Sequence, residues 1–203
     1  MSQIKLLHSG GNGVILAAPS SNPAADRTLT LPGDADGTIA TTATAGKILQ
    51  VVQAYKTDTF SASITNAQES GDITGLTPSI TPTNASNKIL VMWDVMTGNS
   101  TSSRIGIKLY KAGSVLTASL GDAIGSNSRV TAYTSTTADS RSWGLSGKYL
   151  DTAGGTSSIT YSLRLRQGNN ASNDVYVNRQ GSIYDSSASM LAASSLILME
   201  VAA

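Results

Sequence analysis

Apolar and polar residues alternate along several short stretches of this 203-residue chain. In residues 160–166, Tyr161, Leu163 and Leu165 share one side and polar residues occupy the other. Residues 104–110 alternate in the same way, and a glycine turn at 112–114 leads into 115–117. A period of two residues indicates a half-buried β-strand. We therefore predict a strand at 160–166 and a hairpin at 104–117, each with one buried face.

Three other stretches are apolar on both sides rather than alternating. Residues 47–55 show this in their first half and 195–201 show it as a whole, while 88–96 is the most apolar segment of the chain. Continuous apolar runs of this length are typical of strands that are covered on both faces. We predict that 47–55 is a buried strand and that 88–96 and 195–201 are central strands.

The remaining segments are shorter or more polar. Residues 57–70 predict a strand edge or a long loop, and 175–177 a short strand. Residues 72–76 and 79–81 predict short strands, each followed by a proline that stops ladder pairing, Pro78 and Pro82. Residues 129–136 and 140–150 predict an antiparallel pair. Many short strands with turn signals between them favour an all-β fold, an antiparallel β-sandwich of the jelly-roll type.

The first 46 residues follow a different pattern. Short strand-like pieces at 14–18, 28–31 and 38–40 alternate with turn-rich pieces, of which 10–13 predicts a hairpin turn. Such a segment has too little apolar area to form its own core, so it needs other copies of itself or a host particle to pack against. We place a boundary near Gly46, with an extended attachment segment at 1–46 and the β-sandwich domain at 47–203.

Composition narrows the range of partners. Roughly a quarter of the residues are Ser or Thr, and only 13% are charged, as suits strands and turns. The net charge of +1 predicts no nucleic-acid partner, because nucleic-acid binding needs clustered Lys and Arg. The chain contains no cysteine, no apolar run long enough to span a membrane and no secretory h-region at its start.

The sequence predicts no catalytic, cofactor or metal site. The single histidine, His8, has no nucleophile motif beside it, and the nearest approach to Gly-x-Ser-x-Gly, at 144–148, ends in Lys148. The Asp-Ala-Asp-Gly turn at 34–37 lacks the bidentate Glu of a calcium loop, whose twelfth position is Ala45. Asp94 interrupts the apolar run at 88–96, where a paired structural carboxylate is the expected role.

One group of residues suggests a carbohydrate site. Trp143 lies in a polar run beside Arg141, and the loops at 122–129 and 140–147 would form the site around Trp143, Arg141 and Asp122. Aromatic rings stack on sugars, but on strands they more often belong to a core or an interface. Both readings of Trp143 stay open from the sequence.

Residues 13–42, GVILAAPSSNPAADRTLTLPGDADGTIATT, resemble a segment of structural proteins from tailed bacteriophages, particularly marine and cyanobacterial phages. The shared pattern is a strand, an A-P-x-x-N-P turn, then T-L-T-L-P and D-G-T-I/V, and Gly33 is a small insertion. Residues 47–203 resemble the β-rich distal domain that follows this segment in such fibre proteins. Together the two resemblances cover almost the whole chain.

The resemblance implies a homotrimeric virion protein that contacts other virion proteins of the capsid or tail. A head fibre, capsid decoration protein or short tail-fibre tip fits the length of the chain. A trimer would gather the apolar residues of the attachment segment around its axis: Val14, Ile15, Leu16, Leu29, Leu31 and Ile39. The alternatives are a tail-fibre receptor-binding module for host surface glycan and, with least support, a small polysaccharide depolymerase.

Overall fold

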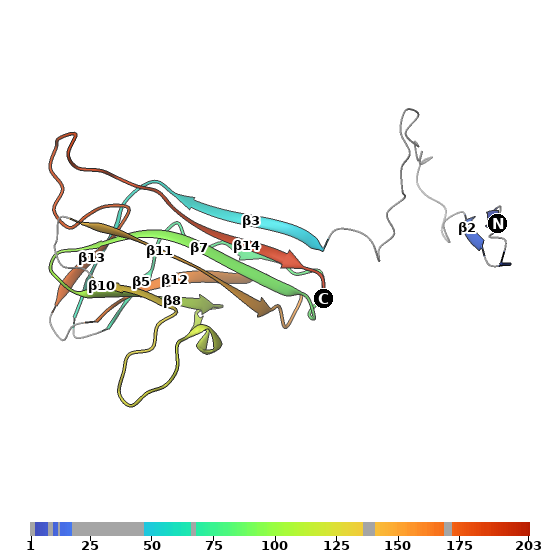
Figure 1. Cartoon of the computed structure of the whole chain (residues 1–203), viewed down its shortest axis with the longest axis horizontal. Helices are drawn as coiled ribbons and strands as arrows, with labels where there is room; N and C mark the ends of the chain where they lie inside the picture. Colours follow the sequence, from blue (N-terminus) through green and yellow to red (C-terminus); the bar gives the residue numbers. More distant parts are fainter. Residues whose placement is uncertain are drawn as a thin grey trace. The chain divides into compact units, whose positions relative to one another are not determined.

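Two antiparallel sheets face each other in the larger part of the chain (Figure 1). The structure is a computed structural model, and it describes residues 3–7, 10–11, 13–17, 47–65, 68–135, 141–168 and 172–203. The chain divides into two units, Met1–Ala45 and Gly46–Ala203. In the first unit, β1 (Gln3–Leu7) and β2 (Gly13–Ala17) form an antiparallel ladder. This pairing confirms the predicted hairpin turn, where Gly11 has a φ of +90°.

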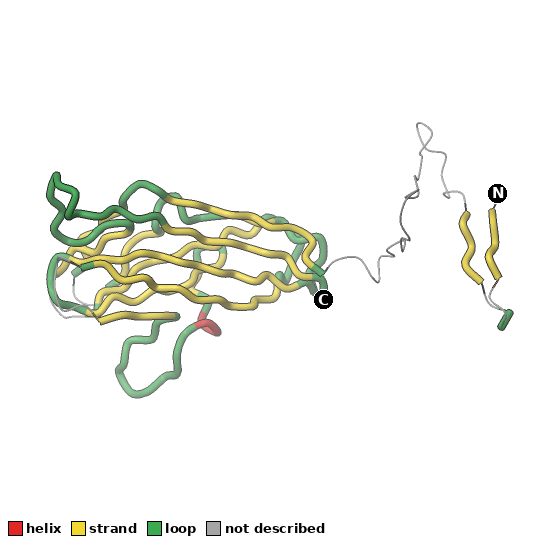
Figure 2. The backbone as a smooth tube through the Cα atoms, turned by 45° about the horizontal axis from the view of Figure 1, so that its top comes forward, coloured by secondary structure: helices red, strands yellow, loops and turns green. Residues whose placement is uncertain are grey.

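We name the two sheets of the second unit after their central strands. The β7 sheet consists of β3 (Ile48–Lys56), β4 (Phe60–Ile64), β7 (Lys88–Asn99), β11 (Ser142–Thr152), β13 (Asn173–Val177) and β14 (Ser194–Val201). The β8 sheet consists of β5 (Glu69–Asp72), β6 (Ser79–Ile80), β8 (Arg104–Lys111), β9 (Ser114–Val115), β10 (Ala132–Ser135) and β12 (Ile159–Gln167). A short 3-10 helix, Thr117–Ser119, follows β9 (Figure 2).

The strand order is that of a jelly roll. Some consecutive strands occupy one strand position in a sheet. The β5 and β6 strands both pair with β12, the β13 and β14 strands both pair with β7, and β3 and β4 pair with β14 and β13. Each of the pairs β3–β4, β5–β6 and β13–β14 therefore acts as one interrupted strand. Counted this way, and without the two-residue β9 that pairs with β8, eight strands lie in the orders 1-8-3-6 and 5-4-7-2 across the two sheets. Two four-stranded sheets linked in this way are the jelly-roll arrangement. The predicted antiparallel sandwich is confirmed.

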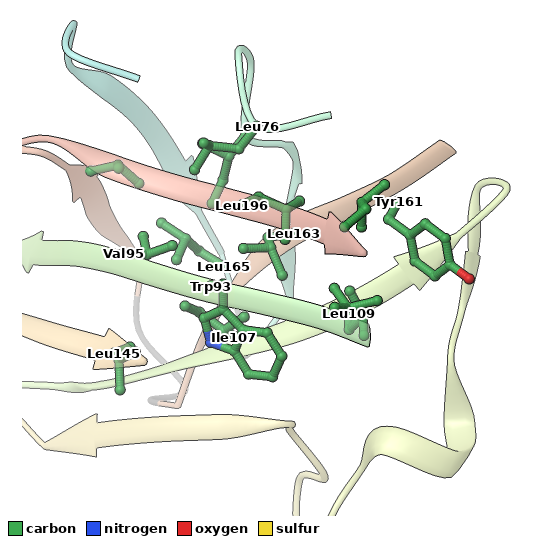
Figure 3. Close-up of a cluster of buried hydrophobic side chains, with 14 of the residues drawn as sticks. Leu76, Trp93, Val95, Ile107, Leu109, Leu145, Tyr161, Leu163, Leu165 and Leu196 are labelled. Atoms are coloured by element: carbon green, nitrogen blue, oxygen red, sulfur yellow. The ribbon is translucent and has the colours of Figure 1, made fainter. Parts of the chain in front are cut away.

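The core lies between the sheets. Alternate residues of β12 and β8 point inward and are fully buried, among them Leu163, Leu165 and Leu109. Figure 3 shows them packed against Trp93 and Leu196 from the opposite sheet. The predicted inward set of β12 is therefore confirmed, and β7 and β14 are central strands as predicted.

Three predictions about strands are wrong. The β3 strand forms as predicted but is not buried on both faces, because Ile48, Leu49 and Val51 are 44–55% exposed. The segments at 129–136 and 140–150 do not pair with each other, since β10 pairs with β8 and β11 pairs with β7. Residues 73–76 form a turn with buried ends rather than a strand, since Leu76 N–H donates to the carbonyl of Ile73 and Gly75 has a φ of +84°.

Candidate functional site

The outward side of the β7 sheet carries apolar residues on four neighbouring strands. The strand registers place Val51, Met199, Leu90 and Leu150 in one row across the sheet. The next row adds Ile197 and Met92. We call these six residues the apolar face: Val51, Leu90, Met92, Leu150, Ile197 and Met199.

The apolar face is open to solvent in the single chain. Val51 and Leu150, at its two ends, are 55% and 54% exposed, and the four residues between them are partly exposed. Further exposed apolar side chains of β3 extend it, namely Ile48, Leu49 and Tyr55. Isolated apolar residues are ordinary on a protein surface, but a contiguous patch across a sheet marks a site of interaction.

Polar residues border the apolar face along one side. Asp94 faces outward in register with Ser146 and Ser195, one row beyond Met92, and Lys148 lies opposite Met92 on β11. Neither Asp94 nor Lys148 makes an ion pair or side-chain hydrogen bond with the residues that the structure describes. One unpaired charge of each sign therefore lies beside the patch.

The sheet that carries the apolar face also ends in open edges. Within the described residues, β3 pairs only with β14, and β11 pairs only with β7. An edge strand presents unpaired N–H and C=O groups and invites pairing with another chain. The apolar face and both edges thus belong to the same sheet.

The outward side of the β8 sheet is charged instead. Glu69 accepts hydrogen bonds from Lys108 Nζ and Tyr110 Oη, both at 2.5 Å, and Arg164 Nε lies 2.6 Å from Asp72 Oδ1. The Arg164 guanidinium also stacks on the Tyr110 ring, 3.9 Å from its centroid. These contacts satisfy most of the charged groups within the sheet's own surface.

A loop folds over one end of this charged surface. The two ends of this loop, residues 121–130, are hydrogen-bonded to each other. Gly121 N–H donates to the Val130 carbonyl at 3.1 Å, and Arg129 Nε donates to the Gly121 carbonyl at 2.7 Å. Val130 packs directly on Gly106 of β8, where a Cβ atom would come within 2.6 Å of Val130 Cγ1. The absence of a side chain at Gly106 thus allows the loop to approach the sheet.

The loop and the sheet enclose an open pocket of about 550 Å³. The strand registers place Tyr133 and Arg166 on either side of Gly106, so the two side chains flank the floor of the pocket. Arg104 and the loop residues 126–128 line the rest. Arg166 Nη2 donates to Ser128 Oγ at 2.7 Å, which ties the loop to β12.

The pocket is positively charged. Among the described residues, Arg104 and Arg166 line it and no acidic residue does. Glu69 lies 3.6 Å from Arg166 Nη1 but accepts shorter hydrogen bonds from Lys108 and Tyr110. Burial raises the pKa of the Glu69 carboxyl, yet those hydrogen bonds outweigh burial and hold the pKa below its usual value. Glu69 is therefore ionised at neutral pH and already engaged with other donors.

The structure separates the three residues that the sequence suggested for glycan contact. Trp143 lies on β11 on the same side as buried Leu145, so its ring is half-buried and faces inward. Arg141 is exposed just before β11. Asp122 is exposed in the loop over the β8 sheet, where its carboxylate accepts a hydrogen bond from Ala123 N–H. No interaction in the described residues joins Asp122 to the other two.

The predicted trimer residues fall in the first unit. Val14, Ile15 and Leu16 lie in β2, paired with β1, whereas Leu29, Leu31 and Ile39 lie outside the described residues. His8 lies outside them as well. Sequence reasoning missed the apolar face, although the apolar runs at 47–55, 88–96 and 195–201 supply most of it.

Metal sites and membrane-spanning helices are both absent from the described residues. These residues contain no group of three or more His, Cys, Asp or Glu side chains that could hold a metal ion. Nor do they include a helix that is long and apolar enough to cross a membrane.

No family model matches the sequence, and no curated protein sequence matches it. Among solved structures, the chain is similar to a chain in the structure of infectious bursal disease virus Gx strain, with a TM-score of 0.40 and 15% identity over 88% of this chain and 42% of that one. It is similar to a chain of the Gt strain structure with a TM-score of 0.38 and 16% identity over 95% of this chain and 48% of that one. The chain spans less than half the length of either solved chain.

Proposed function

We propose that the protein is a non-enzymatic structural component of a virus particle, a homotrimeric fibre or decoration protein. In this proposal, residues 1–46 fasten it to the particle and the jelly roll is displayed outward. The observation that carries the proposal is the apolar face, an open hydrophobic surface on an otherwise complete sandwich. The resemblance of residues 13–42 to segments of tailed-phage structural proteins supplies the virion setting.

The partner that we assign to the apolar face is a second copy of this chain. In a cyclic trimer one part of this surface meets a different part on the next copy, so the surface must offer complementary groups. It carries an apolar centre and, among the described residues, one unpaired charge of each sign, Asp94 and Lys148, at its border. In a symmetric assembly each acid can meet the base of a neighbour. The open edges of β3 and β11 lie at the two sides of the same surface and would be covered by the same contact.

Sedimentation of the full chain tests the assembly. We expect the wild-type protein to sediment as a trimer, and Val51→Asp and Leu150→Asp to dissociate it. Both side chains are more than half exposed in the single chain, so the substitutions leave the fold intact. An unpaired buried charge costs about 3 kcal/mol or more, so association should weaken at least about 100-fold.

The matched control is Ser135→Asp, an exposed strand position on the other sheet, which we expect to stay trimeric. Circular dichroism of all variants checks that the β structure is retained. A wild-type chain that sediments as a monomer at every concentration tested refutes the assembly, and a trimer that survives both substitutions refutes the assigned surface.

The virion setting has a separate test. Antibodies against the jelly roll, applied to purified particles of the virus that encodes this sequence, should bind and be located on head or tail by electron microscopy. Particles that contain no such protein by mass spectrometry would remove the virion proposal while leaving the oligomer result standing.

A further inference from the structure

The pocket on the β8 sheet has unused hydrogen-bond donors. Arg166 donates Nη2 to Ser128, its Nη1 lies 3.6 Å from Glu69, and its Nε–H is buried without a partner among the described residues, so Arg166 contributes positive charge to the pocket rather than a free donor. Arg104 also lines the pocket and makes no side-chain ion pair with the described residues. A guanidinium presents donors in a planar fork that matches the two oxygens of a carboxylate or phosphate. The pocket is therefore suited to an anionic group.

The surrounding charges favour an anion further. The outward side of the β8 sheet carries four basic residues and two acidic ones, a net charge of +2. The acids, Glu69 and Asp72, form their shortest contacts with Lys108, Tyr110 and Arg164 rather than with the pocket arginines. The excess positive charge thus lies at the end of the sheet where the pocket opens.

An exposed aromatic ring in the pocket indicates that the ligand contains a sugar ring as well as an anionic group. Tyr133 stands beside Gly106 at the floor of the pocket and is 67% exposed. Ser126 and Asn127 supply hydroxyl and amide groups from the loop. An apolar ring next to a few converging polar groups is the lining that a sugar needs, since a sugar has both C–H faces and hydroxyls. The pocket volume of about 550 Å³ is within the ordinary range for small-ligand sites, roughly 300–1,000 Å³.

We infer that this pocket binds a saccharide carrying an anionic group, with the arginines Arg104 and Arg166 on the carboxylate or phosphate and Tyr133 against the sugar ring. The inference goes beyond the assembly proposal and does not depend on it, because the pocket lies on the other sheet. It also moves glycan recognition away from Trp143 and Arg141, while the loop that contains Asp122 remains part of the site through residues 126–128.

Calorimetric titration of the full chain tests the inference with defined probes. Trigalacturonic acid supplies the carboxylate, glucose 6-phosphate supplies the phosphate, and maltotriose is the neutral control. We expect at least one anionic sugar to bind at least tenfold more tightly than maltotriose, and the stronger of the two identifies the anionic group. Binding should weaken as salt is raised.

Three variants locate the site. Arg104→Gln and Tyr133→Ala should each weaken binding of the anionic sugar about tenfold or more, and neither residue has a side-chain hydrogen bond that holds the fold in the described residues. Arg141→Gln removes an exposed arginine outside the pocket and should leave binding unchanged.

The following results overturn the inference. These are absence of binding by both anionic sugars, equal binding of maltotriose, or a loss confined to Arg141→Gln. Inorganic phosphate is a further probe: if it binds as tightly as the sugars and Tyr133→Ala has no effect, the pocket takes an anion and the saccharide part is wrong. The oligomeric state is measured on the same samples, so a failure here leaves the assembly proposal untouched.

Discussion

Glu200 offers a sharp test of how the first and last strands of the β-sandwich are joined. It lies on β14, is fully buried, and its carboxylate accepts hydrogen bonds from three residues. The donors are Gln50 Nε2 at 2.6 Å, Thr83 N and Oγ1 at 2.7 and 2.8 Å, and Asn87 Nδ2 at 2.6 Å. The carboxylate thus ties the last strand to β3 and to the segment that leads into β7.

The size of the effect follows from the pKa of Glu200. Burial raises this pKa, but the hydrogen bonds from Asn87, Gln50 and Thr83 outweigh burial and lower it from 4.5 to about 2. At 1.36 kcal/mol per pH unit, the folded state gains about 3 kcal/mol from the ionised carboxylate. Because the pKa is depressed by folding, this contribution is complete above pH 4.5 and is lost as the pH falls toward 2.

We expect Glu200→Gln to lower the free energy of unfolding by about 3 kcal/mol at pH 7, since the amide keeps the shape and loses the charge. The assay is urea unfolding followed by tryptophan fluorescence, at one protein concentration and at steps from pH 7 to pH 2.5. The curves of variant and wild type should converge below pH 4.5. Asp185→Asn, at an exposed carboxylate, is the control and should change little.

Two results would refute this reasoning about Glu200. A difference below about 0.5 kcal/mol at pH 7 would mean that the hydrogen bonds only repay the cost of burying the charge. A large difference that persists unchanged down to pH 2.5 would mean that shape, rather than ionisation, accounts for the loss.

Two further predictions concern the packing of Gly147 against the core and the hydrogen bonds of the buried Asn178 side chain. Gly147→Ala should lower the free energy of unfolding by about 1–3 kcal/mol, because the new Cβ would lie 2.2 Å from Cζ2 of the buried Trp93 ring. Thermal unfolding measures the effect. The control is Gly144→Ala on the same strand, where a Cβ would meet open space. Equal melting temperatures for the two variants would contradict this packing. Asn178→Ala should cost about 3 kcal/mol, since its amide donates to two backbone carbonyls at the β3–β4 junction, both at 2.9 Å. Asn127→Ala, an exposed amide, is its control, and a shift no larger than the control's would show that water replaces those hydrogen bonds.

Strict alternation predicted the β-strands well where one face is buried. In β12, Tyr161, Leu163 and Leu165 are fully buried, as their spacing predicts. The segment at 73–76 shows the limit of this reasoning. Ile73 and Leu76 are fully buried, as in a strand, but the positive φ of Gly75 makes the segment a turn. Apolar residues predict that a segment is buried, but they do not predict its backbone conformation, which depends on single residues such as this glycine.

Sheet membership could not be predicted from local pattern. The β10 and β11 strands follow each other in the chain, and neighbours in sequence often pair. In a jelly roll, most consecutive strands instead pass from one sheet to the other, and an inward-facing residue has the same spacing in either sheet. Nothing in the alternation of 129–136 and 140–150 distinguishes the two arrangements.

The candidate sites were only partly visible in the sequence. The alternation of Trp143, Leu145 and Tyr149 in β11 was enough to place Trp143 on the inward side, but the polar neighbours of Trp143 suggested exposure. The sequence pointed to the loops at 122–129 and 140–147 for a glycan site, which stays a prediction; residues 126–128 of the first loop line a pocket. Its partners on the sheet, Arg104 and Arg166, come from strands that only the fold brings beneath the loop.

The wrong prediction for β3 bears directly on the assembly. The first half of its sequence is apolar on both sides, which predicts burial on both faces, yet Ile48, Leu49 and Val51 are 44–55% exposed in the single chain. Strands with solvent on one face ordinarily carry polar residues there. A chain that keeps apolar residues on the outward side of β3, β7, β11 and β14 at once exposes a surface that favours association. If copies of the chain cover the apolar face, the apolar residues of β3 are exposed in the single chain and buried in the assembly, as its sequence pattern predicts. The sedimentation experiment therefore also tests whether that pattern reflects burial in the assembly.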